Sequence, residues 1–573
     1  MQEEILKLEE VKITYKLQDT NFIATNDINL TLNKGDSLGI IGESGSGKTS
    51  LAMAIIGLLK KPTKVEGKIY YRDTDLQLIS KKELNKIRWN KIAIVYQNSL
   101  DVLNPVLTIG EQILECFGNH FIITKEERKN RVIELLIMVG LDKKIGNCYP
   151  HQLSGGMRQR VLIAMALSCE PEVLIADEPT TALDALSKNE IINLIKKLQK
   201  TKKFTLIVIS HEIETILKLT SRVAVMYSGN IVEEGLTKEV INNPMHNYTR
   251  GLINSSPSIN IYKDMWGIIG EKNSNIKEGC SFYGRCNQSI ELCKTKVPKL
   301  EYVGLNRRIA CNRGGIVTLL HCENINKVYS SKGRDVIACD NCEIQIRHGE
   351  VIALVGESGS GKSTLVGILS GIINPNSGEI KFQGEKVCGN SATNHKGGIQ
   401  IVFQDPFSAT NEQFTVEEII KEPLDIIKVD RKEERKKKVI QVLEEVQLPS
   451  DESFLKRKCY MLSGGQRQRL SLARSLAMEP KLLIADEINS MLDPSTQANI
   501  LRLLKGLQNE RGFAMIYITH DLNIALKISD KTYIMHKGKI IEKGITSQIF
   551  SSPINNYTKS LINEWGNLCG QFR

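Results

Sequence analysis

One short sequence motif occurs twice in this chain in nearly the same form. The repeat limits the folds that the chain can adopt. Residues 152–161 read QLSGGMRQRV, and residues 462–469 read LSGGQRQR. Ser463 follows Ser154 by 309 residues (463 − 154), which is over half of the 573-residue chain. His211 and His520 are also 309 residues apart (520 − 211). A repeat of this length predicts two similar halves, each large enough for its own hydrophobic core.

We place the first half at residues 1–257 and the second at residues 316–573. The joining segment, residues 258–315, is rich in Cys, Gly and Asn and poor in periodic apolar residues. Such a composition predicts a compact linker with little regular structure. Within each half, apolar strands alternate with amphipathic helices. This order is typical of an α/β fold with a mainly parallel sheet and helices on both faces.

Composition narrows the setting in which the chain works. No stretch approaches the roughly 20 uninterrupted apolar residues that span a membrane, and the first residues lack the pattern of a secretion signal. Thirteen cysteines in such a chain favour a reducing cytosol. The net charge of +11 suits an anionic membrane face or nucleic acid, although Lys-rich solvated helices explain it equally well. The densest charged run, residues 431–438, mixes both signs and is interpreted as a solvated helix face.

Each half contains a glycine-rich loop, GESGSGKT at residues 42–49 and GESGSGKS at residues 356–363. Each loop follows an apolar strand and opens a helix, the setting of a phosphate-binding loop. Its N–H groups converge on phosphate oxygens, helped by the helix dipole. The lysines would neutralise phosphates, and the hydroxyls of Thr49 and Ser363 would ligate Mg²⁺. The predicted nucleotide-binding residues here are Gly42, Ser44, Gly45, Gly47, Lys48, Thr49 and Ser50, and Gly356, Ser358, Gly359, Gly361, Lys362, Ser363 and Thr364.

Two carboxylates follow a further apolar strand in each half. They are Asp177 and Glu178 in the first half, and Asp486 and Glu487 in the second. We expect each aspartate to hold Mg²⁺ and each glutamate to polarise the attacking water. Alone, such a pair would more often begin a helix, but a phosphate loop upstream favours catalysis.

Other strand ends carry Gln97 and Gln404, and then His211 and His520. Each glutamine could contact Mg²⁺ and the water, and each histidine could reach the terminal phosphate. Single residues of these types are usually structural, so only the constellation makes them catalytic candidates.

The repeated Ser-Gly-Gly turn precedes a helix with a period of 3.6 residues. Its serine and N–H groups would form a second anion-binding helix N-terminus. The residues concerned are Ser154, Gly155 and Gly156, and Ser463, Gly464 and Gly465.

Taken together, these motifs make both halves resemble the nucleotide-binding domains of ABC ATPases, over nearly the whole chain. The resemblance implies two tandem P-loop domains, each with a RecA-like core, an antiparallel β subdomain and a helical subdomain. It also implies that one ATP lies between the loop of one domain and the Ser-Gly-Gly turn of the other. Tyr15 and Tyr329 resemble the family's adenine-stacking aromatics, with core packing as the alternative. The first site would then combine Lys48, Thr49, Gln97, Asp177, Glu178 and His211 with Ser463 and Gly465. The second would combine Lys362, Ser363, Gln404, Asp486, Glu487 and His520 with Ser154 and Gly156.

Local strings are similar to those of the peptide/nickel importer ATPases: YPHQ at residues 149–152, LNPVLTIG at 103–110, and the tails at 247–250 and 556–559. The resemblance implies an ATPase that energises uptake of peptides or a related small solute (nickel, glutathione or a metallophore). The partners implied by the resemblance are two membrane permease subunits and an extracellular solute-binding protein. The chain would be peripheral, on the cytoplasmic face of the membrane. No nucleic acid partner is expected.

Two alternatives remain. A soluble twin ATPase acting on ribosomes would explain the positive charge. One class of such proteins has an iron–sulfur cluster domain at the N-terminus, and translation-factor versions have a long charged helical linker. Neither feature is present in this sequence. A binding module with inactive ATP sites conflicts with the complete acids and histidines.

The second half departs from the family pattern at two places. Ile488 and Asn489 stand where Pro179 and Thr180 stand in the first half, and Tyr460-Met461 replaces the Pro-His-Gln approach. We expect both sites to hydrolyse ATP, at unequal rates.

Four cysteines fall in the joining segment: Cys280, Cys286, Cys293 and Cys311. They are separated by five, six and seventeen residues, without the short CxxC pairs of structural zinc sites. Four thiolates could hold a [4Fe–4S] cluster, and the segment resembles the Cys-bearing C-terminal extension of oligopeptide-importer ATPases, some of which carry such clusters. Zinc and free thiols remain open.

Overall fold

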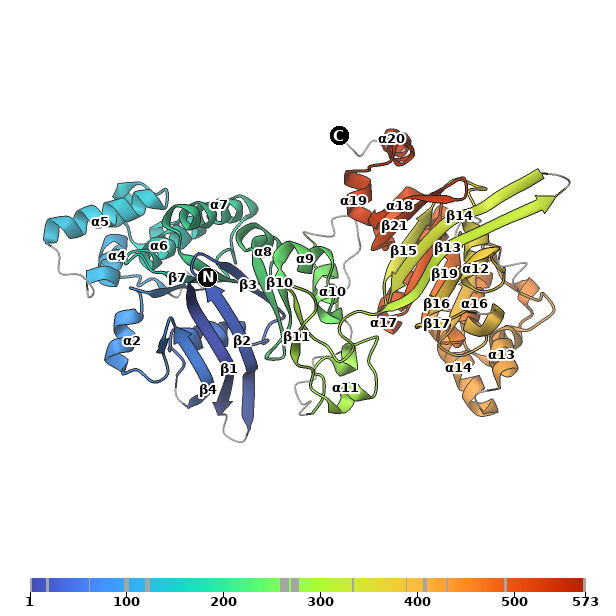
Figure 1. Cartoon of the computed structure of the whole chain (residues 1–573), viewed down its shortest axis with the longest axis horizontal. Helices are drawn as coiled ribbons and strands as arrows, with labels where there is room; N and C mark the ends of the chain where they lie inside the picture. Colours follow the sequence, from blue (N-terminus) through green and yellow to red (C-terminus); the bar gives the residue numbers. More distant parts are fainter. Residues whose placement is uncertain are drawn as a thin grey trace. The chain divides into compact units, whose positions relative to one another are not determined.

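The computed structural model divides the chain into two compact units. The first comprises Met1–Asn260 and Gly270–Gly315, and the second comprises Ile261–Ile269 and Ile316–Arg573. In Figure 1 the first unit runs from blue to green and the second from yellow-green to red. The structure describes residues 3–16, 20–60, 62–96, 102–118, 124–257, 267–268, 270, 278–331, 334–387, 389–405, 410–428, 431–488 and 492–569.

The main sheet of the first unit has a parallel centre, as the sequence predicts. Strands β6, β7, β8, β3 and β9 run parallel to one another, and β10, β12 and β11 extend the sheet antiparallel at one edge. Strands β3, β6, β7 and β8 are buried along their whole length, which explains their continuous apolar sequences. In sheet order the strands are β11 (Leu300–Tyr302), β12 (Arg308–Ala310), β10 (Asn230–Leu236), β9 (Arg222–Tyr227), β3 (Ser37–Ile41), β8 (Thr205–Ile209), β7 (Val173–Asp177) and β6 (Ile92–Val95).

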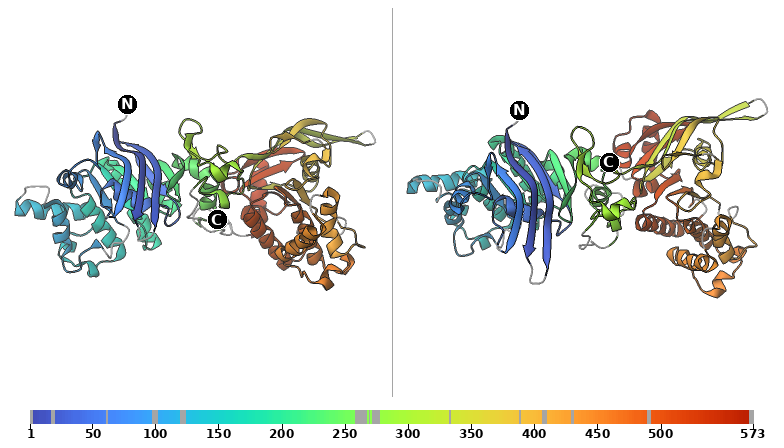
Figure 2. Two further views of the ribbon diagram at one scale, coloured as in Figure 1. Left: turned by 90° about the horizontal axis from the view of Figure 1, so that it is seen from below. Right: turned by 60° about the horizontal axis from the view of Figure 1, so that its bottom comes forward.

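A second, antiparallel sheet of the first unit lies against helix α1 (Lys48–Ile55). Figure 2 shows its long strands side by side in dark blue. Leu38 and Ile40 of β3 belong to the core cluster around α1, whereas a Cβ atom on Gly39 would meet Ile216 of α8. Because alternate residues of β3 face opposite sides, helices cover both faces of the main sheet. The antiparallel strands, in order, are β2 (Asn21–Asn33), β1 (Glu4–Lys16), β4 (Thr63–Tyr71) and β5 (Thr74–Asp75).

Helices α4, α5 and α6 contact one another and form the predicted helical subdomain, which is grouped at one end of the unit in Figure 1. Helices α7 and α8 pack on each other beside the main sheet. The helices of the first unit are α2 (Lys81–Ile87), α4 (Ile109–Gly118), α5 (Lys125–Met138), α6 (Gly155–Ala166), α7 (Ala185–Lys202), α8 (Ile213–Leu219), α9 (Thr237–Asn242), α10 (Asn247–Asn254) and α11 (Leu292–Thr295), with 3₁₀ turns η1 (Lys143–Asn147), η2 (Pro150–Gln152) and η3 (Tyr283–Arg285).

The second unit repeats this architecture. Its main sheet has the order β18 (Ile399–Val402), β19 (Leu482–Asp486), β20 (Ala514–Thr519), β15 (Val351–Val355), β21 (Lys531–His536) and β22 (Lys539–Ile545). Its antiparallel sheet has the order β14 (Arg334–Arg347), β13 (Thr318–Ser331), β16 (Ser377–Phe382) and β17 (Glu385–Lys386). The β13–β14 ribbon projects beyond the rest of the unit (Figures 1 and 2).

The helices of the second unit also match those of the first. Helices α13, α14 and α16 pack together as the helical subdomain. The mixed-charge run at residues 431–438 lies at the start of α14 and is mostly exposed, as expected of a solvated face. The helices are α12 (Lys362–Leu369), α13 (Val416–Ile427), α14 (Lys432–Glu445), α15 (Glu452–Leu455), α16 (Gly464–Ala477), α17 (Pro494–Arg511), α18 (Leu522–Ile528), α19 (Thr546–Ser551) and α20 (Asn556–Cys569), with η4 (Gly389–Ala392) and η5 (Cys459–Met461).

The Cys-bearing segment is more ordered than its composition suggests. Residues 278–315 of this segment contain η3, α11, β11 and β12 and group with the first unit. Strand β12 pairs with β10 and so lengthens the main sheet. Strands β11 and β12 are short and lack a periodic apolar pattern, so the sequence gives no signal for them. They are stabilised by pairing at the β10 edge of the main sheet.

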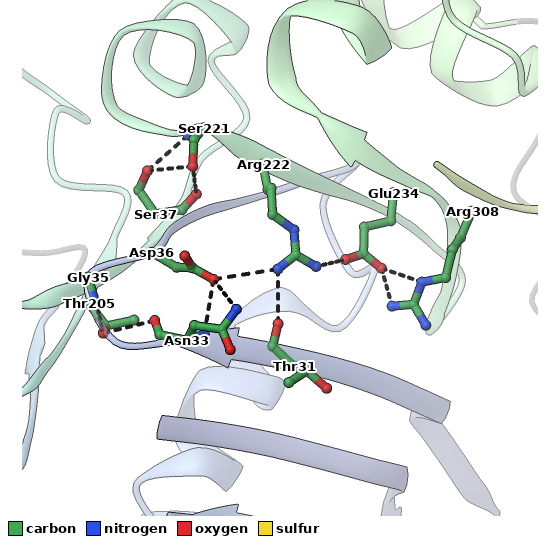
Figure 3. Close-up of polar contacts among 10 residues, drawn as sticks. All are labelled: Thr31, Asn33, Gly35, Asp36, Ser37, Thr205, Ser221, Arg222, Glu234 and Arg308. Atoms are coloured by element: carbon green, nitrogen blue, oxygen red, sulfur yellow. Dashed lines mark hydrogen bonds and ion pairs between the residues drawn. The ribbon is translucent and has the colours of Figure 1, made fainter. Parts of the chain in front are cut away.

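Consecutive ion pairs fix this added edge. Arg307 donates to Glu233 through Nε at 2.9 Å, and Arg308 donates to Glu234 through Nε at 3.0 Å. Figure 3 shows that Arg222 reaches the same Glu234 carboxylate from β9. Glu233 and Glu234 are 0% and 3% exposed. Because buried carboxylates are costly unless they are paired, Glu233 and Glu234 of β10 require Arg308 of β12 and Arg307, the residue before that strand.

Candidate nucleotide-binding sites

The first glycine-rich loop joins β3 to α1 and depends on glycine at two positions. Gly47 has φ 99°, and a Cβ atom there would lie 2.2 Å from the carbonyl oxygen of Ala24. A Cβ atom on Gly42 would lie 2.1 Å from the carbonyl oxygen of Met226. The loop is therefore packed so tightly against neighbouring backbone that only glycine fits. Gly356 and Gly361 meet backbone in the same way in the second unit.

Both loop lysines are buried and fold back over their own loops. Lys48 Nζ donates to the carbonyl oxygens of Gly42 at 2.8 Å and Glu43 at 3.0 Å. Lys362 Nζ donates to those of Gly356 and Glu357, both at 2.8 Å. Burial lowers the pKa of Lys362, although nearby carboxylates oppose this. Each ammonium group is thus held within the loop where a phosphate would bind.

Asp177 and Asp486 end strands β7 and β19, next to the loop hydroxyls. Burial raises the pKa of Asp177 to about 6, while a hydrogen bond with Thr49 opposes the rise. Burial also raises the pKa of Asp486, which is hydrogen-bonded to Ser363. Oδ1 of Asp177 is buried and has no hydrogen-bond partner among the described residues. A buried carboxylate oxygen without a partner, beside a hydroxyl, fits the oxygen ligands that Mg²⁺ prefers.

Glu178 lies directly after β7 in a left-handed conformation, with φ 49°. Its N–H group donates to the carbonyl oxygen of Ile209 at 2.8 Å, which fixes the turn to the end of β8. Its Oε1 lies 3.0 Å from Nδ1 of His211, and Thr181 donates to its Oε2 at 2.8 Å. The structure therefore brings together the predicted catalytic glutamate and histidine of the first half.

Glu487 has the same left-handed backbone, with φ 44°. Its Oε2 lies 3.5 Å from Nδ1 of His520 and accepts a hydrogen bond from Nε2 of Gln404 at 3.4 Å. Lys362 Nζ lies 3.9 Å from its Oε1. Three of the predicted residues thus converge on this carboxylate. Gln97, the counterpart of Gln404, lies outside the described residues.

The two predicted adenine-stacking tyrosines have unequal surroundings. Tyr15 packs against the core of the first unit, and its hydroxyl donates to Oγ of Ser50 in α1 at 3.0 Å. Tyr329 on β13 is 42% exposed, with Lys327 Nζ 5.3 Å from the ring centroid. Tyr15 is thereby tied to the phosphate-loop helix, while Tyr329 is partly exposed and has Lys327 over its ring.

Ser154 and Ser463 are the N-caps of α6 and α16. Each hydroxyl accepts a hydrogen bond from the N–H group three residues later, at 3.3 Å in both cases. The two glycines that follow each serine form the first turn of the helix. Both turns therefore present the N-terminal N–H groups that the sequence predicts for anion binding.

Two residues at the first loop were not predicted as site residues. Tyr248 and Arg285 both hold Glu43, the second residue of the loop. The N–H group of Glu43 donates to the Tyr248 hydroxyl at 2.8 Å, and Arg285 pairs with the Glu43 carboxylate at 3.1 Å. The repeated Asn-Tyr-Thr tail was a usable signal for Tyr248. Arg285 had none, because it lies 242 residues from Glu43.

The four cysteines of the joining segment line one small cavity together with His246 and Phe282. Burial raises the pKa of Cys280 to about 11 and raises that of Cys286. Asn247 donates to Sγ of Cys286 at 3.4 Å. The thiols therefore match a metal centre in kind and number. Within the part of the chain that the structure describes, however, no three His, Cys, Asp or Glu side chains are placed to hold a metal ion.

These features define a P-loop ATPase domain that occurs twice. The family model for the ABC transporter matches residues 25–181 and 339–490, together just over half of the chain. The model for the oligopeptide/dipeptide transporter C-terminal region matches residues 232–293. The chain therefore belongs to the ABC transporter family, and it carries two ATP-binding, ATP-hydrolysing domains of that family.

Two relatives match nearly the whole length of this chain. The glutathione import ATP-binding protein GsiA of Salmonella paratyphi A is 35% identical over 98% of this chain and 89% of its own. The oligopeptide transport ATP-binding protein OppD of Mycobacterium tuberculosis is 31% identical over 97% of this chain and 98% of its own. A dimeric post-hydrolysis ATP-binding cassette bound to ADP and Pi is 34% identical over 41% of this chain and 99% of that chain, with a TM-score of 0.38. Among the described residues, no helix is long and apolar enough to cross a membrane.

Proposed function

We propose that this chain is the ATP-hydrolysing subunit of an importer for peptides or a related small solute, such as glutathione, nickel or a metallophore. The observation that carries this proposal is the combination of two complete sets of ATP-site residues with an oligopeptide/dipeptide transporter C-terminal region. That region also argues against the ribosomal alternative. Relatives named for glutathione and oligopeptide import support the solute class.

Each ATP would be held between the loop of one half and the Ser-Gly-Gly turn of the other. Lys48 and Thr49 would face Ser463 and Gly465, and Lys362 and Ser363 would face Ser154 and Gly156. The support is that every one of these elements is a helix N-terminus with N–H groups available for anionic oxygens. ATP would draw the halves together, and hydrolysis would release them.

Within the first site, the roles follow from the contacts. Lys48 would exchange its loop carbonyls for phosphate oxygens, and Thr49 and Asp177 would hold Mg²⁺, which supplies charge neutralisation on the phosphates. Glu178 would accept a proton from the attacking water. His211, which is 3.0 Å from Glu178, would orient that carboxylate and reach the terminal phosphate. Asp486, Glu487, His520 and Gln404 would act in the same way in the second site, as would Gln97 in the first.

The solute path must be supplied by partners. We infer two membrane permease subunits, an extracellular solute-binding protein and a peripheral position on the cytoplasmic face of the membrane. The names of the relatives and the oligopeptide/dipeptide transporter region support these partners.

We also propose a [4Fe–4S] cluster on Cys280, Cys286, Cys293 and Cys311, with zinc or free thiols as the alternatives. Its support is that all four thiols line one cavity. Iron and acid-labile sulfide should both be present in anaerobically purified protein. Zinc without sulfide, or neither metal, would reject the cluster.

Fractionation and uptake test the main proposal. Tagged chain should co-purify with membranes, and deletion of its gene should abolish uptake of labelled di- to hexapeptides, glutathione or nickel. Return of uptake with the native chain, but not with a Glu178→Gln/Glu487→Gln chain, would support the importer. Sedimentation with ribosomes and unchanged uptake of all these solutes would contradict it.

A further inference from the structure

A buried arginine of the Cys-bearing segment grips the first phosphate loop. Arg285 ends the 3₁₀ turn η3, between Cys280 and Cys286, and its side chain is 8% exposed. Its Nη1 lies 3.1 Å from Oε2 of Glu43, and its Nη2 lies 3.2 Å from Oε1. Such a two-pronged contact fixes both the position and the orientation of a carboxylate. Glu43 is part of the loop itself, so the Cys-bearing segment anchors the loop.

The same turn reaches Glu43 by a second route. Phe282 packs edge-on against Tyr227 and Tyr248, with ring centroids 5.2 and 5.7 Å apart. The Tyr248 hydroxyl accepts the N–H group of Glu43. Arg285 also lies 5.7 Å from the Tyr227 ring centroid. The η3 turn therefore restrains both the backbone and the side chain of Glu43.

From Glu43 the restraint continues to the lysine that binds phosphate. The carbonyl oxygen of Glu43 accepts a hydrogen bond from Lys48 Nζ at 3.0 Å. Arg285, Glu43 and Lys48 thus form a continuous series of contacts. Arg285 acts through Glu43, because its guanidinium contacts the loop carboxylate rather than the lysine.

The second loop has different support. Glu357 occupies the position of Glu43, and Tyr557 the position of Tyr248. Among the residues that the structure describes, no ion pair joins an arginine or lysine to Glu357. The ring beside Tyr557 is that of His536, with centroids 3.9 Å apart. Among the described residues, the ion pair between the Cys-bearing segment and the phosphate loop is therefore a feature of the first site.

We propose that Arg285 is a positioning residue for the phosphate loop of the first ATP site. It holds Glu43 so that Lys48 and the loop N–H groups are arranged for phosphate before nucleotide arrives. This inference rests on the proposed ATP sites and goes beyond them, since it makes nucleotide affinity at one site depend on the Cys-bearing segment. We expect no such dependence at the second site, where no arginine or lysine of the described residues pairs with Glu357.

The test measures ATP affinity of the full chain with one site removed at a time. Lys362→Ala leaves the first site to bind a fluorescent ATP analogue, and Lys48→Ala leaves the second. In the Lys362→Ala chain, Arg285→Met should weaken binding about three- to tenfold, the scale of losing one partly exposed charge-assisted pair. Arg285→Lys should recover part of the loss. In the Lys48→Ala chain, Arg285→Met should change nothing.

Two further variants separate positioning from general loosening. Glu43→Gln should match Arg285→Met, and combining the two should add nothing, because both remove the same pair. Glu43→Gln also carries the test if Arg285→Met fails to fold. Lys294→Met is the matched control, since Lys294 lies in the same segment and pairs with an exposed carboxylate, that of Glu291, at 2.9 Å.

Equal weakening by Lys294→Met, equal weakening of both sites, or unchanged affinity after Arg285→Met would overturn the role of Arg285. The proposed ATP site fails separately if the Lys362→Ala chain with native Arg285 binds no nucleotide. If the Lys362→Ala chain binds nucleotide and Arg285→Met does not change that affinity, only the positioning role of Arg285 is rejected.

Discussion

Nδ1 of His211 lies 3.0 Å from Oε1 of Glu178, whereas Nδ1 of His520 lies 3.5 Å from Oε2 of Glu487. The first glutamate also accepts a hydrogen bond from Thr181. The second accepts a hydrogen bond from Gln404 at 3.4 Å. Near-identical motifs therefore hold the two carboxylates at different distances from their histidines. This difference is the structural reason to expect two unequal ATP sites.

Glu178→Gln removes the charge that polarises the attacking water but keeps the size of the side chain. We expect turnover of the full chain to fall by about 10²-fold or more. Glu487→Gln should lower it less, because that carboxylate is held less closely by its histidine. Phosphate release from the assembled transporter gives the comparison. Identical losses would refute the inequality, and unchanged turnover would remove that glutamate from catalysis.

His211→Ala should reduce turnover by about 10²-fold with little change in the KM for ATP. The histidine holds the catalytic carboxylate, so its loss affects the chemical step more than binding. His395→Ala is a suitable control, since this histidine is exposed and its imidazole hydrogen-bonds to the backbone carbonyl oxygen of Ser391 at 3.0 Å. A KM effect as large as the turnover effect would instead assign His211 to nucleotide binding.

Arg307→Met should lower the free energy of unfolding of the first unit by about 3–5 kcal/mol, because it leaves the buried Glu233 carboxylate without its ion-pair partner. Arg307 and Glu233 side chains are 9% and 0% exposed. Arg502→Met, at an exposed position of α17, should change stability by less than about 0.5 kcal/mol. Denaturant unfolding measures both. Similar stability of the two variants would show that β12 does not depend on this pair.

Glu172 predicts a specific acid sensitivity. Burial raises its pKa, but hydrogen bonds from Lys91 and Arg72 outweigh this and lower it to about 2. A lowered folded-state pKa gives stability that is present above the unfolded pKa, near 4.5, and is lost as pH falls through about 2. The maximum contribution is about 3 kcal/mol. Native chain and Glu172→Gln should therefore differ in thermal stability at pH 7 and converge below about pH 2. A difference that is constant with pH would contradict the ion-pair assignment.

Much of each site was readable from local patterns. Asp177 and Glu178 follow a continuous apolar strand, and parallel strands end at one edge, so their approach to Thr49 and His211 was predictable. The Arg285–Glu43 pair was not, because neither residue lies in a periodic or recurring context that joins them. Strands β11 and β12 were also missed, since edge pairing with β10 and the Arg307–Glu233 pair stabilise them rather than an apolar pattern. Long-range pairing of this kind leaves no short-range signal.

The number of ATP molecules bound per chain tests the central claim most directly. In the Glu178→Gln/Glu487→Gln chain, where hydrolysis is blocked, equilibrium dialysis with Mg²⁺ should give two ATP per chain. Adding either Lys48→Ala or Lys362→Ala should reduce this to one. The claim that the chain has two ATP sites of its own would be contradicted by one ATP per chain in the Glu178→Gln/Glu487→Gln variant. It would also be contradicted by two ATP per chain after either lysine is replaced.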